Sequence, residues 1–469
     1  MLVFVQGLIL IPIIIKVAGE EIYGSYVLVL AYMGVLFAIS SFGITFSCRR
    51  WLPTTQNNEE KGRVFLPQFW FQLSVALMLA VAGGWLYVHF VAPALQSMSP
   101  SLWLLPIYLG AYTVYSQTAD YFRDTHRIGV FTMATTSQPY LFISICLSAY
   151  WFGRHLDLEL LVGSLIVTYS CIGLVLFVRI VREVGCRVSW PTRQDLQAGM
   201  TFGMPMLATS LLEIVLSNGD KFIIGSILSV RDVGMYVPAY TIGLLIMLFP
   251  RIISAVLLPM LSRECDAGEE HKAAHILKTS AKVYLLIAIP YAVGSMVLAH
   301  DLLRLYTNLA IADASYRVVS LVAVAAIFNG LILLKSSVLF VRLDTRFILN
   351  VNLIMAGVSS ILNIVLLSLF HQVWVSGVAV SLSYLMGYGI VSWKLKADVM
   401  NFHVEWGWLL VVLSISCVMG ILVYGLRHLF AWGDGVGSLI GQMMAGVAIY
   451  LLCIGGWYAF HKATHARAG

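Results

Sequence analysis

Apolar runs of about 20 residues recur along the whole chain and are separated by short polar stretches. A helix needs about 20 residues to cross roughly 30 Å of hydrocarbon, whereas the strands of a membrane β-barrel alternate over about ten residues. Because the runs are long and apolar on all sides, they predict transmembrane helices. We expect fourteen spans, at residues 1–15, 22–47, 65–90, 101–119, 129–152, 159–181, 198–227, 233–262, 283–300, 317–340, 348–370, 374–392, 406–426 and 437–460.

The composition agrees with this pattern. Of the 469 residues, 60% are hydrophobic and 11% are charged, whereas a soluble domain carries about a quarter charged residues. The chain also lacks a glycine-rich loop ending in Gly-Lys-Ser/Thr, and its cytoplasmic loops are too short for a nucleotide-binding domain. We therefore expect a polytopic membrane protein whose energy comes from an ion gradient or from the gradient of its substrate.

The distribution of positive charge predicts the orientation. If the N-terminus is cytoplasmic, most of the 29 lysines and arginines fall in the cytoplasmic loops, as the positive-inside rule requires. Both termini are then cytoplasmic. The net charge of +6 is explained by this orientation, so no nucleic-acid partner is expected.

Two sequence echoes indicate an internal repeat. Tyr23-Gly24-Ser25-Tyr26-Val27 opens one span and Val233-Gly234-Met235-Tyr236-Val237 opens another, 210 residues later. A second echo has its two aspartates 220 residues apart and consists of Arg123, Asp124, Thr125 and Arg127 in one place and Arg342, Asp344, Thr345 and Arg346 in the other. Chance is the alternative reading, since Gly and Tyr are common at membrane interfaces. We predict parallel repeats: an N-terminal six-helix lobe at 1–190, a C-terminal six-helix lobe at 191–400, and an accessory helix pair with a short cytoplasmic tail at 401–469.

Three stretches resemble a known family. They are Gly19-Glu20-Glu21-Ile22-Tyr23-Gly24-Ser25-Tyr26 leading to Ser41-Phe42-Gly43-Ile44, then Asn218-Gly219-Asp220-Lys221-Phe222-Ile223-Ile224-Gly225 with Val233-Gly234-Met235-Tyr236, and Leu258-Pro259 with Leu261-Ser262. The chain resembles the Wzx-type polysaccharide or O-antigen flippases of the multidrug/oligosaccharidyl-lipid/polysaccharide exporter superfamily. The resemblance implies an all-α fold of two six-helix bundles in a V around a central cavity, here with two additional C-terminal helices, about 12–14 transmembrane helices in total.

The resemblance also implies a function, which is transport and not catalysis. Such a flippase moves a polyprenyl-diphosphate-linked oligosaccharide from the cytoplasmic to the periplasmic leaflet of the bacterial cytoplasmic membrane, by alternating access, for O-antigen or exopolysaccharide synthesis. Its partners would be this substrate and membrane lipid, with a polysaccharide polymerase and a chain-length regulator as further candidates.

Other functions remain open at this point. One is an ion-coupled small-molecule antiporter of the same superfamily, although the first span has no acidic residue. Another is a peptidoglycan-precursor flippase. A membrane polysaccharide polymerase is disfavoured, because such an enzyme needs a long external loop with clustered acids or histidines, and the external loops here are short.

Basic residues within spans are candidate ligands of a diphosphate. Arg251 follows Pro250 and lies twelve residues from Arg263, about 18 Å along a helix, too deep for easy snorkelling to the interface. Lys335 lies only seven residues from Arg342, so snorkelling is a serious alternative for it. Both are predicted to bind substrate, because charges within the membrane are usually functional.

Acidic residues of the seventh span are candidates for coupling to protons or sodium. Glu213 and Asp220 are seven residues apart and share one helical face. A carboxylate in a low-dielectric site titrates at a higher pH than in water, which would suit ion coupling. The alternative role is structural, with either acid neutralising Arg251 or Lys335 between helices. No metal site and no other cofactor is expected.

Polar stripes on two spans suit a sugar. Tyr108, Tyr112 and Tyr115 share one face of the fourth span, and Gln68 and Gln72 lie one turn apart on the third. Hydroxyl, amide and aromatic groups bind sugars through hydrogen bonds and stacking. For any single member of these stripes, helix packing is the competing role.

Overall fold

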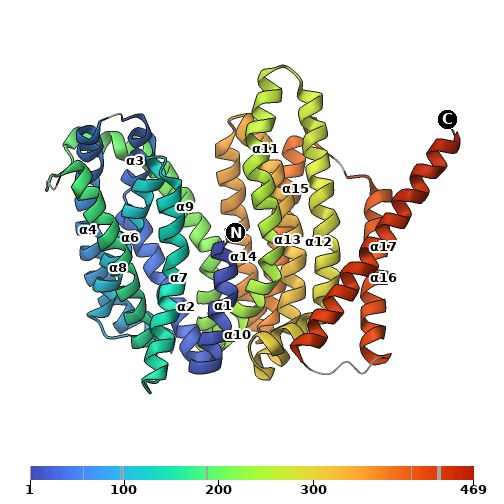
Figure 1. Cartoon of the computed structure of the whole chain (residues 1–469), viewed down its shortest axis with the longest axis horizontal. Helices are drawn as coiled ribbons and strands as arrows, with labels where there is room; N and C mark the ends of the chain where they lie inside the picture. The colour runs from blue at the N-terminus through green and yellow to red at the C-terminus, as the bar shows by residue number, and fades with distance from the viewer. Residues whose placement is uncertain are drawn as a thin grey trace. The chain divides into compact units, whose positions relative to one another are not determined.

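The computed structural model describes residues 2–55, 57–95, 97, 100–185, 188–402, 404–429 and 435–468 (Figure 1). Within these ranges the chain forms helices joined by turns and loops, and no strand is present. The elements of the first half are α1 (Leu2–Ala18), α2 (Glu20–Ser40), α3 (Ile44–Trp51), η1 (Leu52–Thr54), α4 (Asn58–Leu86), η2 (Tyr87–Val91), α5 (Ala92–Ala94), α6 (Leu104–Asp124), α7 (Ile128–Trp151), α8 (Leu158–Val184) and α9 (Arg193–Ile227). Those of the second half are α10 (Val230–Gly243), η3 (Leu244–Met247), α11 (Leu248–Asp266), α12 (Glu270–Tyr306), α13 (Leu309–Val341), α14 (Thr345–Phe370), α15 (Trp374–Lys394), η4 (Leu395–Ala397), α16 (Trp406–Leu429) and α17 (Val436–Ala468).

Each of the predicted spans coincides with a helix. Eleven helices among the described residues are long and apolar enough to cross a membrane, or twelve if the bent α9 is one span. The two other predicted spans are α1, which has only 17 residues, and α6, whose polar side chains lower its hydropathy. The prediction of an all-α, polytopic membrane protein is confirmed.

One helix is much longer than its predicted span. The apolar run at 283–300 lies within α12, which has 37 residues and is therefore about 55 Å long. Its first turns contain Glu270, Lys272, Lys278 and Lys282. Hydropathy detects only the apolar part of a helix, so the polar extension of α12 before residue 283 was not predicted.

The chain packs into two compact units, Met1–Gly234 and Met235–Gly469. Helix α9 packs against α2 and α3 and so belongs to the first unit. The predicted lobes at 1–190, 191–400 and 401–469 were defined by the sequence repeat, whereas the two units are defined by how compactly the chain packs. The lobes therefore stay a prediction.

Each unit is built around one central helix. In the first unit α6 packs between α4 and α8, and α7 lies against α8 (Figure 1). In the second unit α13 packs between α12 and α15, and α14 lies against α15. The same neighbour relations thus occur in the same chain order in both units. Helices α16 and α17 have no counterpart in the first unit and lie beside α12 (Figure 1).

The two glycines of the first sequence echo meet in the first unit. A Cβ atom on Gly24 would lie 2.1 Å from the carbonyl oxygen of Val230, and one on Gly234 would lie 1.9 Å from that of Glu20. Real Cβ atoms do not approach other atoms so closely, so only glycine allows α2 and the start of α10 to touch. The echo therefore marks a helix contact.

The eighth predicted span changes from α-helical to 3₁₀ geometry just before its second proline. Between α10 and α11 the chain makes the 3₁₀ turn η3, and Pro250 follows within the first turn of α11. Proline has no N–H group and cannot complete the helical hydrogen bond to the residue four positions before it. The 3₁₀ stretch therefore ends one turn before Arg251.

Candidate functional site

A small polar cavity lies in the first unit between α3, α4 and α6. The cavity is lined by Thr45, Cys48, Phe65, Gln68, Gln117, Asp120, Tyr121 and Asp124. It has a volume of about 20 Å³. Of the two predicted glutamines, Gln68 lines the cavity, whereas Gln72 accepts a 2.8 Å hydrogen bond from the Thr45 hydroxyl beside it. Carboxylate, amide and hydroxyl groups thus come together in this cavity, although most helices of the chain are apolar.

Ion pairs surround the acidic side of this cavity. Asp120 forms ion pairs with Arg49 at 3.0 Å and with Arg123 at 2.9 Å, and Arg123 also pairs with Asp124 at 3.1 Å. The side chains of Asp120 and Asp124 are only 17% and 11% exposed. The arginines balance the two carboxylates, so neither is a bare charge in a poorly solvated place.

The predicted tyrosine stripe of α6 packs around a fourth tyrosine. The ring of Tyr169 on α8 lies 6.0, 5.1 and 5.0 Å from those of Tyr108, Tyr112 and Tyr115. Tyr108 and Tyr115 are buried, and Phe37 of α2 meets Tyr112 edge-on at 4.7 Å. The structure brings the whole stripe together in one aromatic cluster. Packing between α6 and α8 accounts for these contacts, and the predicted role in sugar binding stays a prediction.

The two acids of α9 differ in their surroundings. Glu213 is exposed, whereas Asp220 is 6% exposed. An oxygen of Asp220 accepts a 2.9 Å hydrogen bond from the backbone N–H of Lys221. The ammonium of Lys221 instead donates to the Ser217 carbonyl and the Asn218 amide oxygen. The shared helical face is thus buried at one end and exposed at the other.

The two predicted cations of the second unit also differ. Arg251 on α11 is exposed, so its guanidinium is accessible to a ligand. Lys335 on α13 is 1% exposed. Its ammonium donates a 3.0 Å hydrogen bond to Asn401 and lies 5.3 Å from the ring of Tyr388 and 4.8 Å from that of Phe402. Lys335 therefore does not snorkel to the interface; it is enclosed by an amide and two aromatic rings.

The segment that follows α15 forms further ion pairs near Lys335. Asp398 accepts hydrogen bonds from Arg342 at 3.0 and 3.2 Å, and Arg342 also donates to Glu270 at 2.8 Å. Burial raises the pKa of Asp398, but the Arg342 hydrogen bonds, the Met400 N–H and the Arg342 charge together outweigh it, so that pKa lies below its usual value. The same pairs, with Glu270 first, raise the pKa of Arg342.

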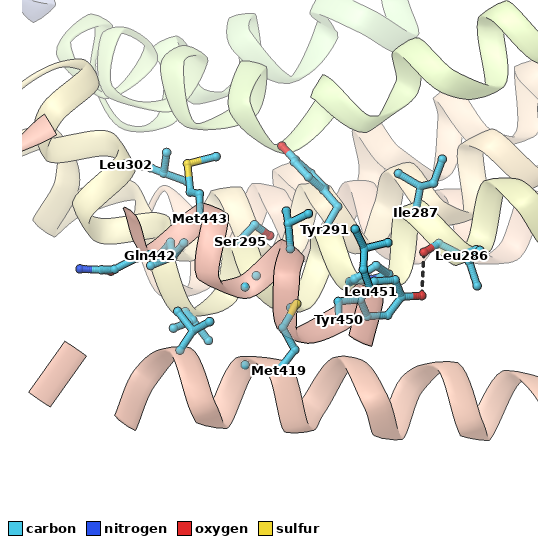
Figure 2. A pocket seen from close by; sticks show the side chains of 18 residues that line it. Leu286, Ile287, Tyr291, Ser295, Leu302, Met419, Gln442, Met443, Tyr450 and Leu451 are labelled. Carbon is cyan, nitrogen blue, oxygen red and sulfur yellow. Dashed lines mark hydrogen bonds between the residues drawn. The ribbon is translucent and has the colours of Figure 1, made fainter. Parts of the chain in front are cut away.

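An apolar groove in the second unit was not predicted. It lies where α16 and α17 pack beside α12, as Figure 2 shows, and has a volume of about 360 Å³. Leu286, Met419, Met443 and Leu451 are among its lining residues. The Tyr450 hydroxyl at its edge donates a 2.8 Å hydrogen bond to the Leu286 carbonyl (Figure 2). Because that hydroxyl already has an acceptor, the surface that the groove presents to a ligand is mainly apolar.

The sequence reasoning missed several residues that the structure groups with the predicted ones. Gln117, Asp120 and Tyr121 lie on the face of α6 opposite the tyrosine stripe. The spacing of Gln117, Asp120 and Asp124 on that face was a readable signal. Tyr169 stands alone among apolar residues of α8, and Asn401 lies in a loop 66 residues from Lys335. The residues next to Tyr169 and Asn401 in the sequence give no sign of these roles, because Tyr169 meets the tyrosine stripe, and Asn401 meets Lys335, only in the folded chain.

Comparison with known proteins agrees with this architecture. The sequence model of the family described as polysaccharide biosynthesis protein matches residues 1–264, and the MatE model matches residues 205–369. "Probable flippase AglR" of Haloferax volcanii is 36% identical over 87 residues, which are 19% of this chain and 18% of that protein. The chain thus spans under a fifth of that relative.

Solved structures share the fold across nearly the whole chain. The lipid II flippase MurJ in an inward closed conformation superposes with a TM-score of 0.73 and 15% identity, covering 97% of both chains. An inward-facing multidrug resistance transporter of the MATE family, from the MOP superfamily, gives 0.63 and 13%, covering 84% of this chain and 96% of that one. At such identities the likeness concerns the fold.

The helices and these matches define a multi-pass membrane protein with the fold that the MurJ flippase and the MATE transporters share. The chain belongs to the polysaccharide biosynthesis protein family, whose model covers more than half of it. By their titles, the structural neighbours named above are a flippase and a multidrug transporter.

Proposed function

We propose that the protein moves a polyprenyl-diphosphate-linked oligosaccharide from the cytoplasmic to the periplasmic leaflet of the bacterial cytoplasmic membrane, for synthesis of a surface polysaccharide. Transport proceeds by alternating access, and both termini are cytoplasmic. The observation that carries this proposal is the apolar groove beside α12, in a chain whose family serves polysaccharide synthesis. A glycan intermediate handled within a membrane needs a lipid anchor, and the groove provides a place for one.

The groove suits a long, unbranched hydrocarbon chain better than a compact drug. It runs along α12 from Leu286 to Leu302, which is about 24 Å of helix. Bilayer lipid is as apolar as the groove, so transfer from lipid brings no hydrophobic gain, and a chain is retained by close packing. The methionines Met419 and Met443 can adapt to an irregular chain.

The polar part of the substrate needs different groups. Arg251 is exposed and can approach a diphosphate, for which a guanidinium is well suited. Lys335 is enclosed by Asn401 and two rings, so it could reach a phosphate only after that hydrogen bond breaks. Gln68, Gln72 and the tyrosine stripe remain candidates for the glycan. A proton or sodium gradient would drive the cycle through Glu213 and Asp220.

The direct test is the leaflet distribution of the lipid-linked oligosaccharide in cells that lack the protein. Deletion should leave the intermediate accessible only from the cytoplasmic side of membrane vesicles, and the intact gene should restore access from the other side. An unchanged distribution after deletion would refute the proposal. Peptidoglycan precursor followed in the same vesicles tests the alternative flippase substrate, and export of organic cations by intact cells tests the antiporter alternative.

A groove-filling variant tests the anchor site separately. A Cβ on Gly294 of α12 would have only the Met419 methyl nearby, at 3.8 Å, so a larger side chain there extends into the groove. Gly294→Leu should slow translocation by about tenfold, whereas Gly294→Ala, which adds one methyl group, should stay near the wild-type rate. Equal rates in both variants would remove the groove from the transport path.

A further inference from the structure

The polar cavity of the first unit contains two buried oxygen atoms that no described group satisfies. They are the Oε1 atom of Gln68 and the hydroxyl of Tyr121. The two side chains are only 9% and 1% exposed, and both line the cavity. A buried polar atom without a hydrogen bond costs about 1–3 kcal/mol, so these atoms indicate a ligand.

The remaining polar lining also presents oxygen atoms. Thr45 has its hydrogen committed to Gln72, and the Gln117 amide nitrogen donates to the Phe69 carbonyl at 3.4 Å. Their oxygen lone pairs remain available, as do those of Asp120 and Asp124 beyond the ones used by the arginines. A lining of carboxylate, amide and hydroxyl oxygens is the kind that hard cations bind.

The size of the cavity limits the ligand. Its interior has room for about one water-sized body, which is too little for a sugar ring. Among the described residues no group of three His, Cys, Asp or Glu side chains has the geometry to hold a metal ion, which disfavours a divalent or transition metal. A small monovalent ion held by two neutral oxygens together with the adjoining carboxylates fits both limits.

We propose that this cavity, between α3, α4 and α6, is a sodium-binding site formed by Gln68, Tyr121 and the adjoining carboxylates of Asp120 and Asp124. The arginine pairs keep the carboxylates neutralised when sodium is absent, and the bound ion competes with Arg49 for Asp120. The site is separate from the acids of α9. Sodium binding can be measured without any lipid-linked sugar, so its failure and that of the proposed function are distinguishable.

The test uses the purified full-length protein in detergent. Choline chloride is replaced stepwise by sodium chloride at constant ionic strength, and the thermal unfolding temperature and the binding of radioactive sodium are measured. A ligand that binds only the folded state raises its stability in a saturable way. Gln68→Leu and Tyr121→Phe should each raise the half-saturating sodium concentration by about tenfold or more, the loss expected when one oxygen contact to a charge disappears.

Matched controls separate the site from general effects on the fold. Tyr87→Phe removes another buried tyrosine hydroxyl of the first unit, and Gln138→Leu removes a half-buried amide of α7. Neither residue lines the cavity, so both variants should keep the wild-type half-saturation. Tyr121→Phe removes a single oxygen and preserves the ring packing, so it remains informative if Gln68→Leu misfolds. No saturable sodium response in the wild type, as for a site that holds only water, or the same half-saturation in Tyr121→Phe, would overturn the proposal.

Discussion

The ammonium of Lys335 lies 3.0 Å from Oδ1 of Asn401 and donates a hydrogen bond to it. This bond joins the C-terminal part of the buried helix α13 to the loop between α15 and α16, 66 residues away. The loop is also held by Asp398 with Arg342, and by Glu405 with Lys278 at 2.8 Å. The loop therefore links α12, α13 and α15 at one end of the second unit.

The Lys335–Asn401 pair should contribute to stability through the charge that it satisfies. Asn401→Ala leaves a buried ammonium without this acceptor and should lower the free energy of unfolding by about 1–3 kcal/mol. The same change in a Lys335→Met background should cost much less, because no charge remains to be satisfied. Thermal unfolding of the four proteins in detergent gives the coupling, and equal costs in both backgrounds would show that the bond is unimportant.

Arg251 should matter for transport and not for stability. Arg251→Ala should abolish flipping, whereas Arg251→Lys should keep part of it, because a lysine retains the charge but loses the fork that binds two phosphate oxygens. The assay is the leaflet distribution of the lipid-linked oligosaccharide. Arg263→Ala, an exposed arginine on the same helix, is the control and should be active. Full activity of Arg251→Ala would remove Arg251 from the substrate site.

Glu213 should respond to pH if it couples transport to protons. Glu213→Gln keeps the size of the side chain but cannot bind and release a proton, so transport by this variant should become insensitive to an imposed proton gradient. Vesicles with a preset gradient provide the measurement. Glu59→Gln, at the exposed start of α4, should behave like the wild type. A pH response that persists in Glu213→Gln assigns the coupling elsewhere.

The Asp398–Arg342 pair should stabilise the protein above, but not below, an acidic threshold. The folded pKa of Asp398 is lowered by Arg342 and the Met400 N–H despite burial, whereas an unfolded aspartate titrates near 3.9. Its stabilisation is thus fully present above about pH 5 and is lost as the pH falls through the folded pKa. The gap in unfolding temperature between wild type and Asp398→Asn should be constant from pH 7 to 5 and shrink below pH 4. A gap that does not narrow in acid would contradict the assignment.

The close contact of Gly24 should tolerate no side chain. Gly24→Ala places a Cβ 2.1 Å from the Val230 carbonyl oxygen, and relieving this overlap should cost about 1–3 kcal/mol. Gly34 lies on the same helix with nothing within 4 Å of its Cβ position. Gly34→Ala should be neutral or stabilising by up to about 1 kcal/mol, because alanine favours the helix. Thermal unfolding compares the two, and equal stability would show that the helices are not in contact there.

The order of apolar and polar residues along the chain was enough to predict most of the helices. The bilayer forces every backbone group in an apolar run into a helix, so hydropathy located α2, α8 and α13 without reference to their neighbours. The same reasoning found Gly24 and Gly234 as an echo, but it could not show that they touch. It also located α6 while overlooking the second polar face that carries Gln117 and Asp120, because a count of apolar residues does not record what a helix faces.

What the sequence determined by itself is therefore the class of fold, a polytopic helical membrane protein, because the length and apolarity of each run are local properties. The surroundings of the functional candidates depended on tertiary structure. Lys335 and Arg251 are both basic residues within apolar runs, yet one is enclosed by Asn401 and two rings while the other is exposed. The groove beside α12 and the cavity around Gln68 are formed by helices distant in the sequence. Their walls come together only through long-range packing, for which no short stretch of residues carries a signal.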